Sequence, residues 1–147
     1  MGASGWSYVV AYQPDLDAAL DALRDEVFAE GRYWWARGTI PNSASDYPHR
    51  PTTMKELFDD ELVQESGTHS ILDVHRVLDE GERPEFGTVE PVSAAEALRL
   101  AGTERLTREH LDSIRGLAAQ GWFGRCAVLH DAQGKPQEIY FWGFSGD

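Results

Sequence analysis

The order of strand-like and helix-like segments constrains the fold of this chain more than any other feature. Strand-like alternation occurs in Trp6–Tyr12, and two further strand-like segments, Arg125–Asp131 and Glu138–Ser145, lie near the other end of the sequence. Within the last segment, Ile139–Trp142 is apolar on both faces, which predicts a central strand. Because the strands do not alternate strictly with helices, we expect an α+β fold. It should have a mixed or mainly antiparallel sheet of about four to five strands, with about four helices packed mainly on one face.

The segments between these strands carry helical signals. Apolar residues recur at helical spacing, and capping patterns precede most of the apolar stripes. These signals predict helices bounded by Asp15–Glu30, Thr53–Gly67, Ser93–Gly102 and Thr107–Gly121.

Shorter elements and one long loop complete the chain. Thr68–Leu78 and Phe86–Val92 have the composition of strands, and Gly134 lies in a turn that favours a positive φ. Arg32–Pro51 contains three prolines and no regular period, which predicts a long loop of the kind that is often functional or mobile. We interpret residues 1–147 as a single domain.

Charge and missing motifs limit the classes of function. The net charge is −12, from 25 acidic and 13 basic residues, so nucleic acids and anionic membranes are disfavoured and a basic protein partner fits better. A single cysteine, no basic and apolar leader and no apolar run of ~20 residues favour the cytoplasm. No nucleotide-binding, zinc-protease or CxxC motif is present, so we expect no cofactor.

The strongest candidate for chemistry is His69-x-x-x-Asp73-x-His75. If Thr68–Leu78 is a strand, the side chains of His69, Asp73 and His75 point to the same side. Asp73 and His75 could then share a metal ion or form an acid–base pair, with His69 joining if the strand bends. The alternative is a solvated face with a salt-linked histidine.

Aromatic and acidic residues offer candidate binding surfaces. Tyr33, Trp34 and Trp35 open the long loop, and adjacent tryptophans on an extended segment point to opposite sides, so one of them can be core. Two acidic groups lie on predicted helices and could receive a basic partner, although ordinary solvated faces would look the same. Their members are Asp17, Asp21 and Asp25, and then Asp59, Asp60 and Glu61, with Glu65 on the same predicted helix as the second group.

Cys126 lies next to Arg125, and a neighbouring cation can activate a thiol. A lone cysteine in an apolar strand is more often inert core. We therefore expect Cys126 to be buried rather than a nucleophile.

Two segments carry a resemblance. E-S-G-T-H-S-I-L-D (Glu65 to Asp73) and E-I-Y-F-W-G-F-S-G-D (Glu138 to Asp147), together with the opening Y-V-V-A-Y-Q-P-D, resemble segments of a group of small bacterial proteins. The resemblance implies a stand-alone protein and implies no activity, substrate or catalytic residue.

Two hypotheses from different classes follow. The first is a small acidic binding module, such as an inhibitor or immunity-type protein that neutralises a basic partner. The second is a small enzyme or ligand-binding domain with its site around His69, Asp73 and His75. A homodimer is compatible with either, because symmetric assembly is common and aromatic residues are plentiful.

Overall fold

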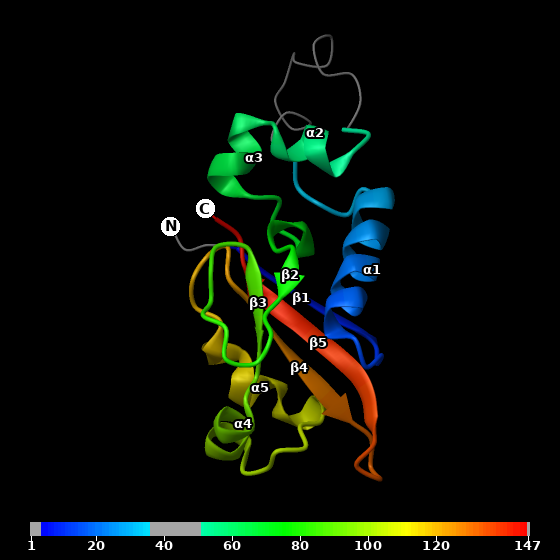
Figure 1. Cartoon of the computed structure of the whole chain (residues 1–147), viewed down its shortest axis with the longest axis vertical. Helices are drawn as coiled ribbons and strands as arrows, with labels where there is room; N and C mark the ends of the chain where they lie inside the picture. The colour runs from blue at the N-terminus through cyan, green and yellow to red at the C-terminus, as the bar shows by residue number, and fades with distance from the viewer. Residues whose placement is uncertain (1–3, 36–50, 147) are drawn as a thin grey trace.

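A five-stranded mixed sheet forms the centre of the computed structural model, which describes residues 4–35 and 51–146 (Figure 1). Its order is β1-β5-β4-β3-β2; β1 and β4 pair with β5 antiparallel, whereas β4–β3 and β3–β2 are parallel. The strands are β1 (Gly5–Ala11), β2 (Arg76–Val77), β3 (Thr88–Pro91), β4 (Gly124–His130) and β5 (Pro136–Phe144). The α+β class and the mixed sheet are therefore confirmed.

Short helical segments connect the strands. Among the described residues, only α1 exceeds eight residues, and none of their helices has the length and apolar character to cross a membrane. The α-helices are α1 (Leu16–Ala29), α2 (Met54–Phe58), α3 (Glu61–Ser66), α4 (Ala94–Ala101) and α5 (Leu111–Ile114). The 3₁₀ segments among the described residues include η2 (Ile71–Asp73), η3 (Arg108–His110) and η4 (Arg115–Leu117).

Both faces of the sheet are covered, not mainly one as predicted. Along β5, Ile139 and Phe141 belong to a core with α1, α2 and α3, while Tyr140 and Trp142 belong to a second core with α4 and α5. Alternate residues of a strand point to opposite faces, so the two cores lie on opposite sides of the sheet. The apolar run Ile139–Trp142 requires this double cover, since either face alone would leave large side chains in water.

Several local predictions are confirmed. The side chain of Asp15 accepts a hydrogen bond from the Ala18 N–H at the start of α1, and Ser93 with Glu96 forms a capping box on α4. β5 lies between β1 and β4, as a strand that is apolar on both faces should. Gly134 has φ +79 in the turn between β4 and β5, where a side chain would be strained.

The helix predicted over Thr53–Gly67 is broken into two. The Asp60 carboxylate accepts a hydrogen bond from the Leu62 N–H at 2.9 Å and so opens α3 as a separate helix. Aspartate competes for backbone donors in this way and favours caps over helix interiors.

The strand predicted over Thr68–Leu78 is wrong. Gly67 and His69 have φ +76 and +54, conformations outside the extended region. Ser70 then caps η2 by accepting a hydrogen bond from the Leu72 N–H, and only Arg76–Val77 pairs in the sheet. Local hydrogen bonds from polar side chains replace the ladder here.

The long-loop prediction is described only at its two ends. Arg32–Trp35 has no helix or strand, and residues 36–50 lie outside the described residues.

Candidate functional site

Gly67 allows the loop between α3 and η2 to fold back on itself. A Cβ on Gly67 would lie 2.5 Å from Oδ2 of Asp73, and its φ of +76 with ψ of −173 is a conformation that essentially only glycine adopts. The loop therefore closes directly over the Asp73 carboxyl.

Asp73 is a buried carboxyl at the centre of this loop, with 4 % of its surface exposed. Its Oδ1 accepts hydrogen bonds from the Thr68 N–H at 2.7 Å and from the Thr68 hydroxyl at 2.8 Å. Its Oδ2 is buried and has no hydrogen-bond partner among the described residues. Oδ1 therefore accepts two hydrogen bonds, whereas the buried Oδ2 accepts none from the described residues.

Burial raises the pKa of Asp73 from 3.8 to about 6, against the opposing effect of the Thr68 hydrogen bonds. The His69 charge and its backbone N–H also lower this pKa, but that N–H makes no hydrogen bond of ordinary geometry to Oδ2. Near pH 6 the carboxyl is therefore a mixture of its neutral and charged forms.

His69 joins this loop to the end of β5. Its Nδ1 lies 3.2 Å from Oγ of Ser145, and its ring meets the Trp34 ring edge-on with centroids 4.8 Å apart. Ser145 is completely buried, so a substrate has no access to its hydroxyl. The Ser145–His69 pair is consequently a structural contact and does not form a nucleophile and base.

His75 contacts the segment before β3 and does not share a strand with His69 and Asp73. It is exposed, its backbone N–H donates to the Gly87 carbonyl at 2.8 Å, and its ring lies against the Gly87 backbone. Burial of part of the ring lowers its pKa, and the charges of Arg24 and Arg76 lower it further. The pKa of Asp73, by contrast, is lowered by His69.

The structure therefore brings His69 and Asp73 together, whereas the His75 ring lies against Gly87, because the strand that would have aligned the three side chains does not form. Within residues 4–35 and 51–146, no group of three or more His, Cys, Asp or Glu side chains could hold a metal ion. The metal hypothesis for Asp73 and His75 has no geometric support in this region.

The three aromatic residues divide between core and surface. Tyr33 and Trp35 are buried, and the Tyr33 ring stacks on Phe28 with centroids 5.8 Å apart. Trp34 is 36 % exposed, and its backbone N–H donates to the Thr68 carbonyl at 2.8 Å. Trp34 is thus held against the loop with part of its ring in solvent.

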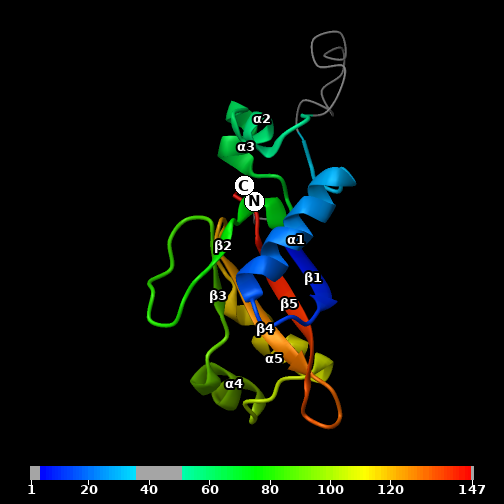
Figure 2. The same ribbon diagram turned by 45° about the vertical axis from the view of Figure 1, so that its right-hand side comes forward.

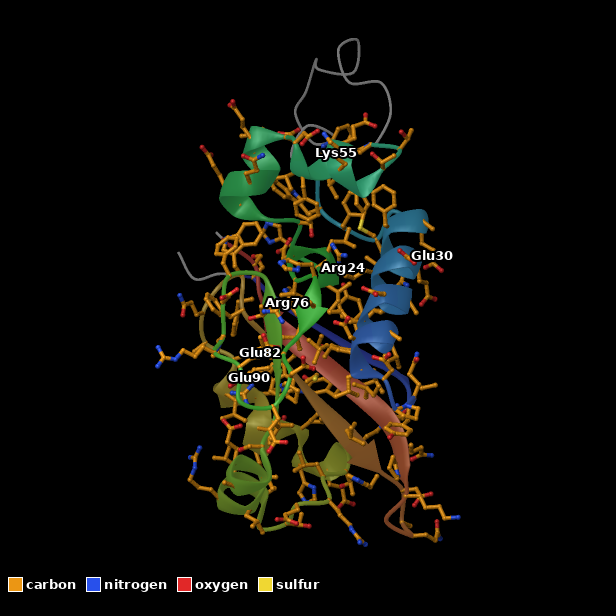
Figure 3. All side chains as sticks on the ribbon, viewed as in Figure 1. Arg24, Glu30, Lys55, Arg76, Glu82 and Glu90 are labelled. Carbon is orange, nitrogen blue, oxygen red and sulfur yellow. The ribbon has the colours of Figure 1, made fainter. Side chains whose placement is uncertain are left out.

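Three of the six candidate acidic residues have structural roles. Asp17 accepts a hydrogen bond from the Val77 N–H at 2.8 Å, Asp60 caps α3, and Asp59 pairs with Lys55 at 2.7 Å. Figure 3 shows Lys55 on α2, at the same end of the molecule as α3.

The other three, Asp21, Asp25 and Glu61, are exposed and have no hydrogen bond or ion pair with a described residue. Asp21 and Asp25 flank Arg24, which reaches from α1 towards η2 and donates weakly to the Leu72 carbonyl at 3.4 Å (Figure 3). These three carboxylates are available to a partner.

Cys126 is buried in the core, and burial raises the pKa of its thiol to about 12 despite the nearby Arg125 charge. A thiol with this pKa carries almost no thiolate at neutral pH. The expectation that Cys126 is inert core agrees with this environment.

Sequence reasoning missed the buried ion pairs of Arg125. This guanidinium lies beside a cavity of about 480 Å³ and contacts Glu90 at 3.2 Å and Glu96 at 2.5 Å. Burial raises the pKa of Glu96, but hydrogen bonds from Arg125 and Ser93 outweigh this and lower it overall. Because two carboxylates balance the charge of Arg125, the cavity does not suit an anion. In the sequence, an arginine inside an apolar strand was the feature that could have indicated these ion pairs.

Comparisons of the chain with protein-family models, with curated proteins and with solved structures find no match.

Proposed function

We propose that this protein is a protein-binding module that takes a basic partner surface, as inhibitors and immunity-type proteins do. The surface we assign to the partner, called here the α3-end surface, consists of Trp34, His69, Glu61 and Glu65. The Trp34 N–H donates to the carbonyl of Thr68, which lies two residues after the end of α3, and this bond holds Trp34 near that end of the helix.

The partly exposed side chain of Trp34 is the main observation behind this proposal. Tryptophan is among the residues that most often dominate the energy of protein interfaces. The backbone bond to Thr68 and the edge contact with His69 hold the ring in place, so little conformational entropy is lost when a partner covers it.

Charge supports a basic partner. Glu61 and Glu65 are exposed on α3, the helix that ends two residues before Thr68, in a chain whose net charge is −12. Exposed carboxylates of this kind raise the rate of encounter with a basic protein and repel acidic ones.

The alternative of an active site around His69, Asp73 and His75 has less support. The Asp73 carboxyl is enclosed by Thr68 and Gly67, and the His75 ring lies against Gly87. A reaction needs acid, base and substrate within hydrogen-bond reach of one another.

The test begins with capture of a partner by the untagged protein from the cells that make it, at low salt. The purified pair is then measured by calorimetry. We expect Trp34→Ala to raise Kd at least ~30-fold, the effect of losing a dominant interface residue. Because the Trp34 ring is partly exposed and its backbone bond remains, the variant should fold; circular dichroism checks this.

The charge component has a matched control. Glu61→Gln with Glu65→Gln should weaken binding at low salt and have little effect at about 1 M salt, where screening acts over ~3 Å. Glu80→Gln with Glu104→Gln removes the same charge from exposed positions elsewhere and should leave Kd unchanged. Capture of no basic partner, or equal binding by Trp34→Ala and the wild type, would refute the proposal.

A further inference from the structure

The two edges of the sheet differ in how they are protected. The β2 edge is two residues long, and its outward Val77 N–H is taken by the Asp17 carboxylate at 2.8 Å. The β1 edge is seven residues long, and no strand of the described residues pairs with its outer side (Figure 2). A long open edge is a template for another strand, and proteins normally block it with charge, proline or a bulge.

The unpaired backbone groups of β1 can be assigned from its register. Tyr12 N–H donates to the Gln137 carbonyl and Ser145 N–H donates to the Ser4 carbonyl, so the even-numbered residues of this segment bond to β5. Antiparallel hydrogen bonding alternates, which leaves the N–H and C=O groups of the odd-numbered residues pointing outwards. These residues are Gly5, Ser7, Val9 and Ala11, all exposed, and no described residue accepts from their N–H groups.

The composition of this edge selects its partner. Residues 5–11 contain no charged side chain and no proline, whereas the whole chain carries a charge of −12. A basic partner finds no carboxylate here to recognise. A second copy of the same acidic chain, in contrast, can approach closely only where charge is absent.

We propose that two copies of this chain associate through antiparallel pairing of β1 with β1 of the partner copy, to form a continuous ten-stranded sheet. The register that overlaps all seven residues places the two-fold axis at Tyr8, opposes Ser7 to Val9 and opposes Gly5 to Ala11. Each of the outward groups then finds a partner, with about eight backbone hydrogen bonds across the axis.

The pairing goes beyond the binding of a basic partner and uses a different surface. β1 (Gly5–Ala11) shares no residue with the α3-end surface. The two interactions also respond oppositely to salt, because screening weakens attraction to a basic protein but relieves repulsion between two acidic copies.

Sedimentation of the purified full chain alone tests the proposal. The pairing of one short edge buries less area than a standard interface, so we expect a dimer with Kd in the micromolar range, measured between about 1 μM and about 1 mM. Added salt should lower this Kd. A wild-type protein that stays monomeric throughout this range overturns the proposal.

Substitutions at the edge identify the surface. Val9→Lys should raise the dimer Kd at least ~10-fold, because a lysine on the open edge disfavours strand addition. Leu98→Lys is the matched control: it adds the same charge at an exposed apolar position on α4 and should dimerise like the wild type. Equal weakening by both substitutions would overturn the assignment to β1.

Amide exchange gives a second readout that needs no substitution. The N–H groups of Ser7 and Val9 should become protected as protein concentration rises, while those of Tyr8 and Val10 should be protected at every concentration by β5. Exchange of Ser7 and Val9 that is independent of concentration would contradict the pairing. Trp34→Ala should dimerise normally, so a failure of the partner proposal leaves this result interpretable.

Discussion

At the residue scale, Asp73 makes the stability of the protein depend on pH. Its pKa is about 6 in the folded chain and has an ordinary value of 3.8, so the folded state holds this proton more tightly than the unfolded state. The stabilisation from the protonated form is complete below pH 3.8 and is lost as pH rises through about 6. For a group this buried, the loss is on the order of 3 kcal/mol.

Asp73→Asn should remove this dependence. The Asn side chain cannot ionise, so the difference in unfolding free energy between variant and wild type should shift in favour of the variant by roughly 2.5 kcal/mol from pH 4 to pH 8. Urea unfolding at several pH values measures it. Asp112→Asn, which removes an exposed carboxyl, should keep the wild-type profile. A difference between Asp73→Asn and wild type that stays constant with pH would contradict the explanation.

At Gly67 a single added methyl group should destabilise the loop around Asp73. Gly67→Ala places a Cβ 2.5 Å from the Asp73 carboxyl and forces an alanine into a backbone conformation that costs about 1–3 kcal/mol by itself. We expect a loss of roughly 3 kcal/mol or more in urea unfolding. Gly81→Ala also has a positive φ, but its Cβ meets nothing within 4 Å, so it should lose only about 1 kcal/mol. Equal losses would show that the contact with Asp73 is unimportant.

At the element scale, Glu96 of α4 both caps its own helix and pairs with an arginine of β4. The Glu96 carboxylate accepts from the Ser93 N–H within the capping box and also from Arg125 of β4. The capping box is visible in the sequence, but its link to Arg125 is not, because that contact depends on how helix and strand pack.

Glu96→Gln separates the two roles. Glutamine preserves the capping box, so the variant tests the charge alone. Arg125 is largely buried and would keep the Glu90 carboxylate and its hydrogen bonds to the Glu90 and Pro91 carbonyls. We therefore expect a loss of about 2 kcal/mol in urea unfolding, below the full cost of an unpaired buried charge. Glu138→Gln breaks the more exposed pair with Arg108 and should lose at most ~1 kcal/mol. If Glu138→Gln were the more harmful change, the assignment would fail.

Elements were predictable where their signals are local. β1, β5 and α1 follow from alternation, helical spacing and the Asp15 cap, all read from neighbouring residues. The segment Thr68–Leu78 was not predictable, because its apolar composition fits a strand while His69 has a positive φ that its residue type does not demand. His69, Asp73 and His75 were aligned only by the period of a strand that η2 replaces.

At the scale of the whole molecule, the partners of the candidate site are far apart in sequence. His69 meets Ser145 across 76 residues, and no local pattern signals such a contact. The division of Tyr33, Trp34 and Trp35 between core and surface was anticipated in kind, because adjacent residues of an extended segment point to opposite sides. Which of them is exposed depends on the packing of α1 and the loop after α3.

The position of β5 in the sheet also determines when the fold can form during synthesis. Gly5 pairs with Phe144, so β1 leaves the ribosome long before its partner exists. At about 5–20 residues per second, the delay is roughly 7 to 28 s. During this interval β1 and β4 lack the strand that lies between them. A nascent chain that stops before Pro136 therefore has no centre of the sheet, and its apolar strands remain substrates for chaperones and proteases.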